Sequence, residues 1–215
     1  MRTLPGDTEA PLHYVALGDS TVAGVGGSSY WLSYPSRLLK RLQTIYPQAR
    51  LTNLGMGGAL APDVVEFELD RAVALEPQLT TLSIGPNDVT GGEDLDVYRA
   101  SLVTIFNRLC IETAAVMVVN TIPDMSLATR FSGAEKQRVG RLAVLFNDAI
   151  TESAQRFDVE VVDLYTPSRA LGTGYAALLS EDGYHPSDLG YEKWAELMWV
   201  GIERRLGSVA AQPEG

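Results

Sequence analysis

The stretch 13-HYVALGDS-20 sets the pattern from which the fold can be read. Its first five residues form a short apolar run that Gly18 ends, which is typical of a strand buried on both faces of a sheet. Four further runs of this kind follow along the chain, and turn-forming or polar residues close each of them. They lie at 51–54, 79–84, 115–119 and 159–162. The sequence therefore predicts five buried strands.

Segments with helical periodicity separate these runs. Apolar residues recur at steps of three and four within 38–46 and 95–109, as expected for amphipathic helices. Ser132 and Glu135 have the spacing of a capping box at the start of another helix. Its expected apolar face consists of Val139, Leu142, Leu145, Phe146, Ala149 and Ile150. A last helix is expected from about 187 to 206, with an inward face of Leu189, Trp194, Leu197 and Met198.

Strands that alternate with helices favour parallel pairing through right-handed crossovers, and hence a sheet with helices on both faces. We therefore predict an α/β protein, a three-layer α/β/α sandwich around a five-stranded parallel sheet. Ligands of such sheets bind outside the carboxyl ends of the strands, so functional residues are expected in the loops that follow strands. The whole chain, 1–215, is interpreted as one domain with a polar leader at about 1–11 and a frayed tail at about 207–215.

Composition narrows the classes of function. The chain has 17 Lys and Arg against 27 Asp and Glu, a formal charge of −10, which argues against a nucleic-acid partner. No run approaches ~18 apolar residues, and the first dozen residues lack the apolar segment of a signal peptide. Neither a membrane span nor a signal peptide is predicted, so the expected location is the cytoplasm. The single cysteine, Cys110, excludes a disulfide within the chain.

Four blocks of polar and glycine residues stand in loops that should open at one edge of the sheet. They are Gly18-Asp19-Ser20, Asn53 to Gly58, Gly85-Pro86-Asn87-Asp88 and Asp182-Gly183-Tyr184-His185. Together, and in this order, they resemble the SGNH hydrolase family, also called the GDSL esterases and lipases. The resemblance spans positions 18 to 185 and implies a flavodoxin-like sheet. The common signatures of nucleotide-binding proteins, of α/β-hydrolases with a G-x-S-x-G elbow and of H-E-x-x-H metalloproteases are absent.

The resemblance implies a serine esterase that hydrolyses small-molecule carboxylic esters by acyl transfer. It places the nucleophile at Ser20, the base at His185 and the acid that orients the base at Asp182. It places the oxyanion-hole donors at Ser20, Gly58 and Asn87. No metal and no organic cofactor is implied.

The residue types fit these roles. A serine hydroxyl needs a base within hydrogen-bond reach, and a carboxylate on the far side of the imidazole fixes the tautomer of that base. The other histidine, His13, opens the first strand, so five residues of strand separate it from Ser20 by roughly 16 Å. Glycine at position 58 lets a backbone N–H approach the developing oxyanion closely, and its choice over Gly57 rests on the spacing from Asn53.

Two other functions remain open at the level of sequence. Asp19, Asp88, Asp182 and His185 could instead hold a divalent metal for phosphoester cleavage. The chain could also be a non-catalytic α/β binding domain, because a fold alone implies no function. Asp19 and Asp88 are more simply interpreted as carboxylates that tie neighbouring loops together.

The substrate-binding residues and the oligomeric state are not assigned by the sequence. Two loops, 122–132 and 164–180, could line an acyl pocket or pack beneath themselves. Their apolar candidates are Ile122, Met125, Leu127, Phe131, Tyr175 and Leu178. No inserted segment resembles a long lid, so the sequence predicts an open site for short to medium acyl chains. A cluster of cations is expected to be a solvated helix face: Arg130, Lys136, Arg138 and Arg141.

Overall fold

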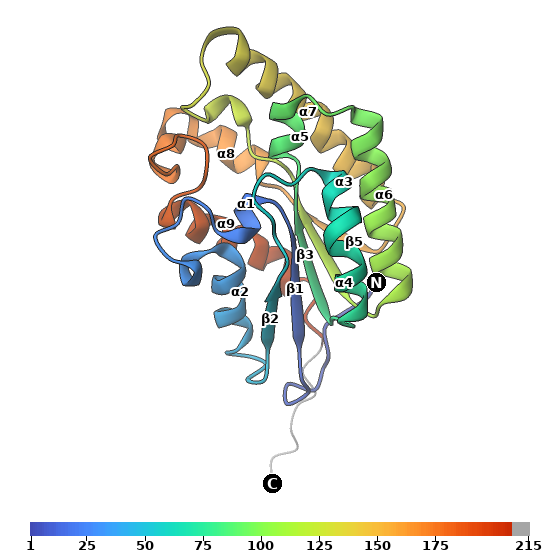
Figure 1. Cartoon of the computed structure of the whole chain (residues 1–215). Helices are drawn as coiled ribbons and strands as arrows, with labels where there is room; N and C mark the ends of the chain where they lie inside the picture. The colour runs from blue at the N-terminus through green and yellow to red at the C-terminus, as the bar shows by residue number, and fades with distance from the viewer. Residues whose placement is uncertain (208–215) are drawn as a thin grey trace.

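The computed structural model describes residues 1–207 and has one five-stranded sheet between two layers of helices (Figure 1). The strands are β1 (His13–Gly18), β2 (Arg50–Asn53), β3 (Leu79–Ser83), β4 (Val116–Asn120) and β5 (Val159–Val162). All neighbouring strands pair in parallel, in the order β2-β1-β3-β4-β5. This confirms the predicted three-layer α/β/α sandwich with the flavodoxin-like strand order.

Helices connect the strands. They are α1 (Ser20–Ala23), α2 (Tyr34–Leu42), α3 (Ala61–Asp63), α4 (Leu69–Ala74), α5 (Pro86–Gly91), α6 (Leu95–Glu112), α7 (Gly133–Ala154), α8 (Tyr165–Leu171) and α9 (Asp188–Glu203). Short 3₁₀ turns occur at η1 (Tyr30–Leu32), η3 (Met125–Leu127) and η4 (Gly172–Leu178), and the π-helical segment η2 (Val64–Glu68) joins α3 to α4. Within residues 1–207, none of these helices combines the length and the apolar character needed to cross a membrane.

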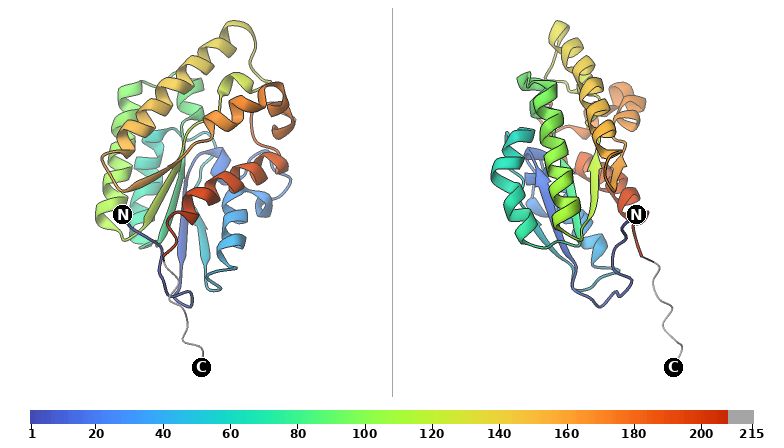
Figure 2. Two further views of the ribbon diagram at one scale, coloured as in Figure 1. Left: turned by 180° about the vertical axis from the view of Figure 1, so that it is seen from behind. Right: turned by 90° about the vertical axis from the view of Figure 1, so that its right-hand side faces the viewer.

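Side chains of β1 alternate between two hydrophobic cores. Val15 and Leu17 pack in the core beneath α4, α6 and α7, whereas Tyr14 and Ala16 pack in the core beneath α2 and α9. The two helical layers lie on opposite faces of the sheet in the rotated views (Figure 2). Burial on both faces explains why the sequence of this strand is apolar without a polar alternation.

The sequence placed each strand within one residue of its observed ends, but β2 and β5, at the edges of the sheet, are only partly buried, and parts of the helix predictions were wrong. Ser132 precedes α7 without a side-chain capping bond, and the Glu135 carboxylate pairs with Arg138 at 2.8 Å instead of reaching back to Ser132, so the predicted capping box does not form. Leu145 is 48% exposed and Leu189 is 46% exposed, although both were expected to face inward. The buried stripe of α7 is narrow and leaves Leu145 beside it, and Leu189 lies in the first turn of α9.

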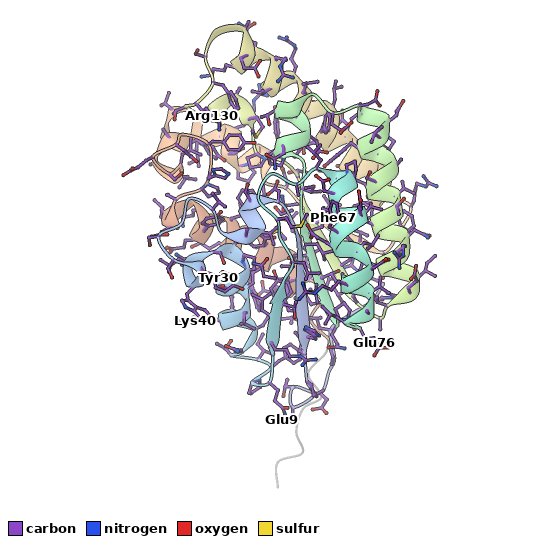
Figure 3. All side chains as sticks on the ribbon, viewed as in Figure 1. Glu9, Tyr30, Lys40, Phe67, Glu76 and Arg130 are labelled. Carbon is purple, nitrogen blue, oxygen red and sulfur yellow. The ribbon has the colours of Figure 1, made fainter. Side chains whose placement is uncertain are left out.

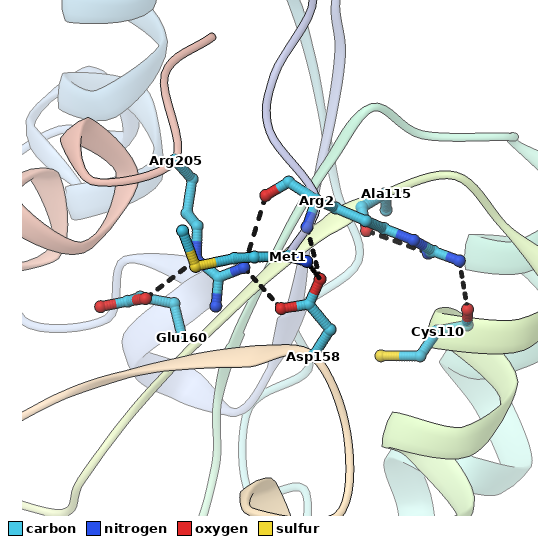
Figure 4. A network of polar contacts seen from close by, with 7 residues as sticks. All are labelled: Met1, Arg2, Cys110, Ala115, Asp158, Glu160 and Arg205. Carbon is cyan, nitrogen blue, oxygen red and sulfur yellow. Dashed lines mark hydrogen bonds and ion pairs between the residues drawn. The ribbon is translucent and has the colours of Figure 1, made fainter.

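The N-terminal segment is tied to the edge of the sheet at which β4 and β5 begin (Figure 4). The Arg2 guanidinium donates to the carbonyl oxygen of Cys110 at 2.6 Å, and Leu4 is buried. Nearby, the Arg205 guanidinium binds Asp158 at 2.7 Å and Glu160 at 2.9 Å. The leader therefore belongs to the folded structure. Of the tail predicted at about 207–215, the part from 208 onward lies outside the described residues.

Candidate active site

Ser20 is held at the carboxyl end of β1, where the strand order reverses between β1 and β3. The Asp19 carboxylate accepts hydrogen bonds from the backbone N–H of Thr21 at 2.8 Å and from its hydroxyl at 2.7 Å, which caps the short helix α1. Gly18 has φ +134°, and a Cβ at this position would lie 1.9 Å from the carbonyl oxygen of Ser83. Only glycine allows this turn, so the Gly-Asp-Ser sequence positions Ser20 by backbone geometry.

A chain of hydrogen bonds links Ser20 to His185 and Asp182. The Nε2 atom of His185 lies 3.0 Å from Ser20 Oγ, and its Nδ1 atom lies 2.5 Å from Asp182 Oδ2. An ionised carboxylate can only accept hydrogen bonds, so the proton of the neutral imidazole belongs on Nδ1. The lone pair of Nε2 then faces the serine hydroxyl, which is the arrangement required of a general base.

Asp182 is kept ionised by the turn that carries it. Its Oδ1 atom accepts hydrogen bonds from the Ser180 hydroxyl at 2.8 Å and from the backbone N–H groups of Tyr184 and His185, both at 2.9 Å. Partial burial raises the pKa of the Asp182 carboxyl, but the hydrogen bonds from His185, Tyr184 and Ser180 outweigh it and hold the pKa below the usual range. The same turn therefore supplies both the acid and its stabilisation.

Close packing of neighbouring loops fixes the position of this turn. Gly183 has φ +69°, and a Cβ there would lie 2.4 Å from the Thr129 hydroxyl oxygen. A Cβ on Gly26 would lie 2.7 Å from the Cβ of His185. Glycine at both positions lets the loops that flank His185 approach it more closely than a larger residue would permit.

Gly58 and Asn87 lie next to each other near the end of β1. The Asn87 Nδ2 group donates to the carbonyl oxygen of Ala59 at 3.0 Å, and Met56 N–H donates to the carbonyl oxygen of Gly18 at 2.9 Å. Gly58 is exposed with φ +83°, and its N–H has no hydrogen-bond acceptor among residues 1–207. One hydrogen of the Asn87 amide also stays available, so both groups can donate to a developing oxyanion.

The residues of the alternative metal site do not form one. Asp19 and Asp88 are fully buried, and Asp88 Oδ1 accepts a hydrogen bond from the backbone N–H of Ala61 at 2.9 Å. Asp182 is instead bound to His185. Within the described part of the chain, no group of three or more His, Cys, Asp or Glu residues is arranged to hold a metal ion. The Asp88 carboxylate connects its loop to that of Ala61, as the sequence favoured, whereas the Asp19 carboxylate caps α1 within its own loop.

Sequence reasoning missed Glu68, a third buried carboxyl near Ser20. Its Oε2 atom accepts a hydrogen bond from the backbone N–H of Gly18 at 2.9 Å, and the residue is 1% exposed. Burial raises the pKa of Glu68 to about 8, that of Asp88 to about 7 and that of Asp19 to about 6. An acidic residue between apolar neighbours, in the stretch 64-VVEFEL-69, is the signal that could have indicated it.

Among the pockets around these loops, two contain apolar residues that the sequence singled out. One is a cavity of about 380 Å³ whose wall includes Asn87, Phe131 and Tyr184. The other is an apolar cavity of about 230 Å³ between α8, η4 and α9, and Tyr175 and Leu178 line it. Two further candidates from the sequence, Ile122 and Met125, are buried in the core instead.

Comparisons with known proteins agree with this architecture. Axe2, an acetylxylan esterase from Geobacillus stearothermophilus, superposes with a TM-score of 0.73 at 21% identity over 96% of this chain and 100% of that one. The structure of TesA has a TM-score of 0.74 at 19% identity over 90% of this chain and 99% of that one. LAE5, an α/β hydrolase enzyme from the metagenome of Lake Arreo in Spain, has a TM-score of 0.72 at 20% identity, covering 95% and 100%. No curated protein sequence matches the chain.

The sheet order and its structural neighbours define an SGNH-type hydrolase fold. The chain belongs to the GDSL-like lipase/acylhydrolase family, whose model matches residues 16–193. It is a carboxylic ester hydrolase. The resemblance drawn from the four sequence blocks is thereby confirmed.

Proposed function

We propose that the chain is a serine esterase that forms an acyl-enzyme on Ser20, with His185 as the general base and Asp182 as the residue that orients it. The observation that carries this proposal is the continuous hydrogen-bond chain from Asp182 Oδ2 through the imidazole of His185 to Ser20 Oγ. A reactive serine, an imidazole in the correct tautomer and an ionised carboxylate are the three groups that acyl transfer requires.

Acylation begins when Ser20 Oγ attacks the ester carbonyl carbon and His185 Nε2 takes the hydroxyl proton. Negative charge then builds on the carbonyl oxygen, where Gly58 N–H, the Asn87 amide and the backbone N–H of Ser20 donate hydrogen bonds. His185 returns its proton to the alcohol oxygen as the carbon–oxygen bond of the ester breaks. The alcohol leaves, and the acyl group stays on Ser20.

Deacylation repeats these steps with water as the nucleophile. His185 removes a proton from water, which attacks the acyl carbon, and then returns a proton to Ser20 Oγ as the acyl bond breaks. The carboxylic acid is released and the starting protonation state is restored. Throughout both steps Asp182 stabilises the imidazolium form of His185 without itself taking up the proton.

We infer short to medium acyl chains for the substrate. The apolar cavity lined by Tyr175 and Leu178 extends to Pro186, the residue after His185, and its volume of about 230 Å³ suits a short acyl chain better than a long one. The structural neighbour that is an acetylxylan esterase makes acetyl esters the first substrates to assay.

The decisive experiment combines a variant, a covalent label and a substrate series. Ser20→Ala should lower kcat by roughly 10⁴-fold or more with an unchanged melting temperature, and an organophosphonate should label Ser20 in the unmodified protein. Ser132→Ala is the control, because Ser132 is exposed and its side chain makes no hydrogen bond within residues 1–207. Among p-nitrophenyl acetate, butyrate, octanoate and palmitate, kcat/KM should fall toward the long chains. Activity that survives in Ser20→Ala but is lost in EDTA would instead support metal-dependent chemistry.

A further inference from the structure

A polar pocket adjoins the proposed oxyanion site and is not used by the chemistry described above. It has a volume of about 380 Å³. Asn87 and Thr90 line one side of it, and Arg130, Phe131 and Glu135 line the other. A substituent of an ester bound at Asn87 can enter this pocket without leaving the catalytic centre.

Tyr184 forms the wall between this pocket and the general base. Its ring lies 5.0 Å from the imidazole of His185, edge to face at 88°. The ring of Phe131 packs against the other side of Tyr184 at 5.9 Å, also nearly perpendicular. The pocket is therefore one side chain away from His185, and its shape is set by rings that are packed against each other.

Arg130 is anchored at this wall. Its backbone N–H donates to the carbonyl oxygen of Gly183 at 3.1 Å, which joins the loop of Arg130 to the turn of His185. Its guanidinium carbon lies 5.5 Å from the centre of the Tyr184 ring. Cation–π contact of this kind orients the guanidinium while leaving its N–H groups free to donate. Figure 3 places Arg130 at the opposite end of the molecule from Glu9.

Arg130 has no ion-pair partner in the described structure. No carboxylate within residues 1–207 forms an ion pair with it. The other charged residue of the pocket, Glu135, is already bound by both Nε and Nη2 of Arg138, at 2.9 and 2.8 Å. In a chain with a formal charge of −10, an uncompensated cation beside the reaction centre is a local exception.

The sequence predicted that four cations form a solvated helix face, and the position of Arg130 differs from this prediction. The four are Arg130, Lys136, Arg138 and Arg141. Arg138 is engaged by Glu135 and by the carbonyl oxygen of Thr90 at 2.9 Å. Lys136 and Arg141 border a separate surface groove that does not include Asn87 or Tyr184. Of the four cations, Arg130 alone lines the pocket at Asn87.

We propose that this pocket is a subsite for an anionic group carried by the ester substrate, and that Arg130 is the residue that determines this specificity. The inference rests on the proposed esterase function and narrows its substrates to esters that bear a carboxylate or a similar anion. Arginine is suited to this role because its planar guanidinium can donate two parallel hydrogen bonds to a carboxylate. Such bonds would hold one end of the ester while its carbonyl lies against Ser20 and Asn87.

The test compares matched esters that differ by one charge. On the acyl side, the substrates are p-nitrophenyl 4-carboxybutanoate and its methyl ester. On the alcohol side, they are 4-carboxyphenyl acetate and 4-(methoxycarbonyl)phenyl acetate. The arm that responds to the Arg130 variants identifies the side of the ester that enters the pocket. The variants are Arg130→Gln, Arg130→Lys and the control Arg141→Gln, which removes an equal charge from the separate groove.

We expect Arg130→Gln to lower kcat/KM for the anionic ester of one arm about tenfold, mainly by raising KM, with less than a twofold change for its neutral partner. Arg130→Lys should recover part of the loss, and Arg141→Gln should show none. Because Arg130 is exposed, these variants should keep the melting temperature of the unmodified protein. Equal effects of Arg130→Gln on charged and neutral esters in both arms, or no effect in either, would overturn the proposal. Hydrolysis of the neutral esters that disappears in Ser20→Ala would still establish the esterase function, so the two failures are distinguishable.

Discussion

At the scale of single residues, the site uses carboxyl groups in two opposite states. Asp182 lies in an exposed turn and accepts hydrogen bonds from His185, Tyr184 and Ser180, which stabilise its charged form. Glu68 is buried and accepts one hydrogen bond from Gly18, so desolvation favours its neutral form. Burial and the number of donors around each group together decide its protonation, and both depend on the fold rather than on the residue type.

Replacing Asp182 by Asn should remove the interaction that orients the imidazole of His185. An amide can donate to Nδ1 of His185, which favours the tautomer with a proton on Nε2 and removes the lone pair that faces Ser20. We expect kcat for p-nitrophenyl acetate to fall about 10³–10⁴-fold with little change in melting temperature. Glu181→Gln is the control, because it removes a neighbouring exposed charge that does not contact His185. An Asp182→Asn enzyme with nearly full activity would show that Asp182 does not set the tautomer.

Sequence reasoning proposed Ser20, Asp182, His185 and Asn87 because short motifs fix their spacing and because each follows a strand or precedes a helix. The structure joins Ser20, His185 and Asp182 by hydrogen bonds. Glu68 could not be found in this way, because it belongs to none of the four sequence blocks and does not follow a strand. Its contact with Gly18 forms only when η2 packs beside the end of β1.

At the scale of secondary structure elements, strands were easier to predict than helix faces. Every residue of β1 is buried because helices cover both faces of the sheet, so the strand is visible in the sequence as an unbroken apolar run. A helix such as α7 buries only a stripe, and the neighbours of that stripe depend on tertiary packing. Leu145 lies beside the stripe, while the smaller Ala143 lies within it. Residue size and hydrophobicity alone did not distinguish these two positions.

Two neighbouring arginines that follow α9, Arg204 and Arg205, bind acidic residues at the beginning of β5 and can be compared directly. Arg205 is 4% exposed and binds both Asp158 and Glu160, whereas the Arg204 side chain is 62% exposed and binds Glu160 at 3.1 Å. Removing a buried partner leaves carboxylates without compensation, while an exposed pair contributes little. We expect Arg205→Met to lower the free energy of unfolding by about 1–3 kcal/mol and Arg204→Met by less than about 0.5 kcal/mol.

Urea unfolding of both variants checks this difference. Activity toward p-nitrophenyl acetate should stay unchanged in each, because these contacts lie at the amino end of β5, whereas Ser20 follows the carboxyl end of β1 in the same parallel sheet. Equal losses of stability in the two variants would mean that burial of Arg205 does not determine its contribution.

At the scale of the whole molecule, the buried acids should shape how stability depends on pH. The chain carries a formal charge of −10, yet Asp19, Glu68 and Asp88 lie inside it and each has one buried oxygen without a hydrogen-bond partner among residues 1–207. Their pKa values are raised by burial, so the folded state binds these protons more tightly than the unfolded state does. The stability that these three groups contribute is fully present below the ordinary carboxyl pKa and is lost as pH rises through their raised pKa values.

The surface carboxyls act in the opposite direction. Hydrogen bonds outweigh partial burial at Asp182, Asp158 and Asp163, and lower their pKa values. These groups contribute stability above the ordinary carboxyl pKa, and this stability is lost as the solution is acidified. The two sets together predict a maximum of stability near the ordinary carboxyl pKa, at about pH 4, and a decline from there to about pH 8 that an ordinary set of surface carboxyls would not produce.

Glu68→Gln tests the origin of that decline. The glutamine amide would keep an oxygen that accepts the hydrogen bond of Gly18 and could not ionise, so the variant should lose less stability than the unmodified protein between pH 5 and 9. From the rise of the pKa of Glu68 from 4.5 to about 8, we expect the difference to be on the order of 2 kcal/mol or more at pH 9. The measurement is urea unfolding across this pH range.

Glu66→Gln, which removes an exposed charge from the same segment η2, is the control and should leave the decline unchanged. A decline of the same size in Glu68→Gln would mean that Glu68 is ionised in the folded protein, and that its bond to Gly18 is charged rather than neutral.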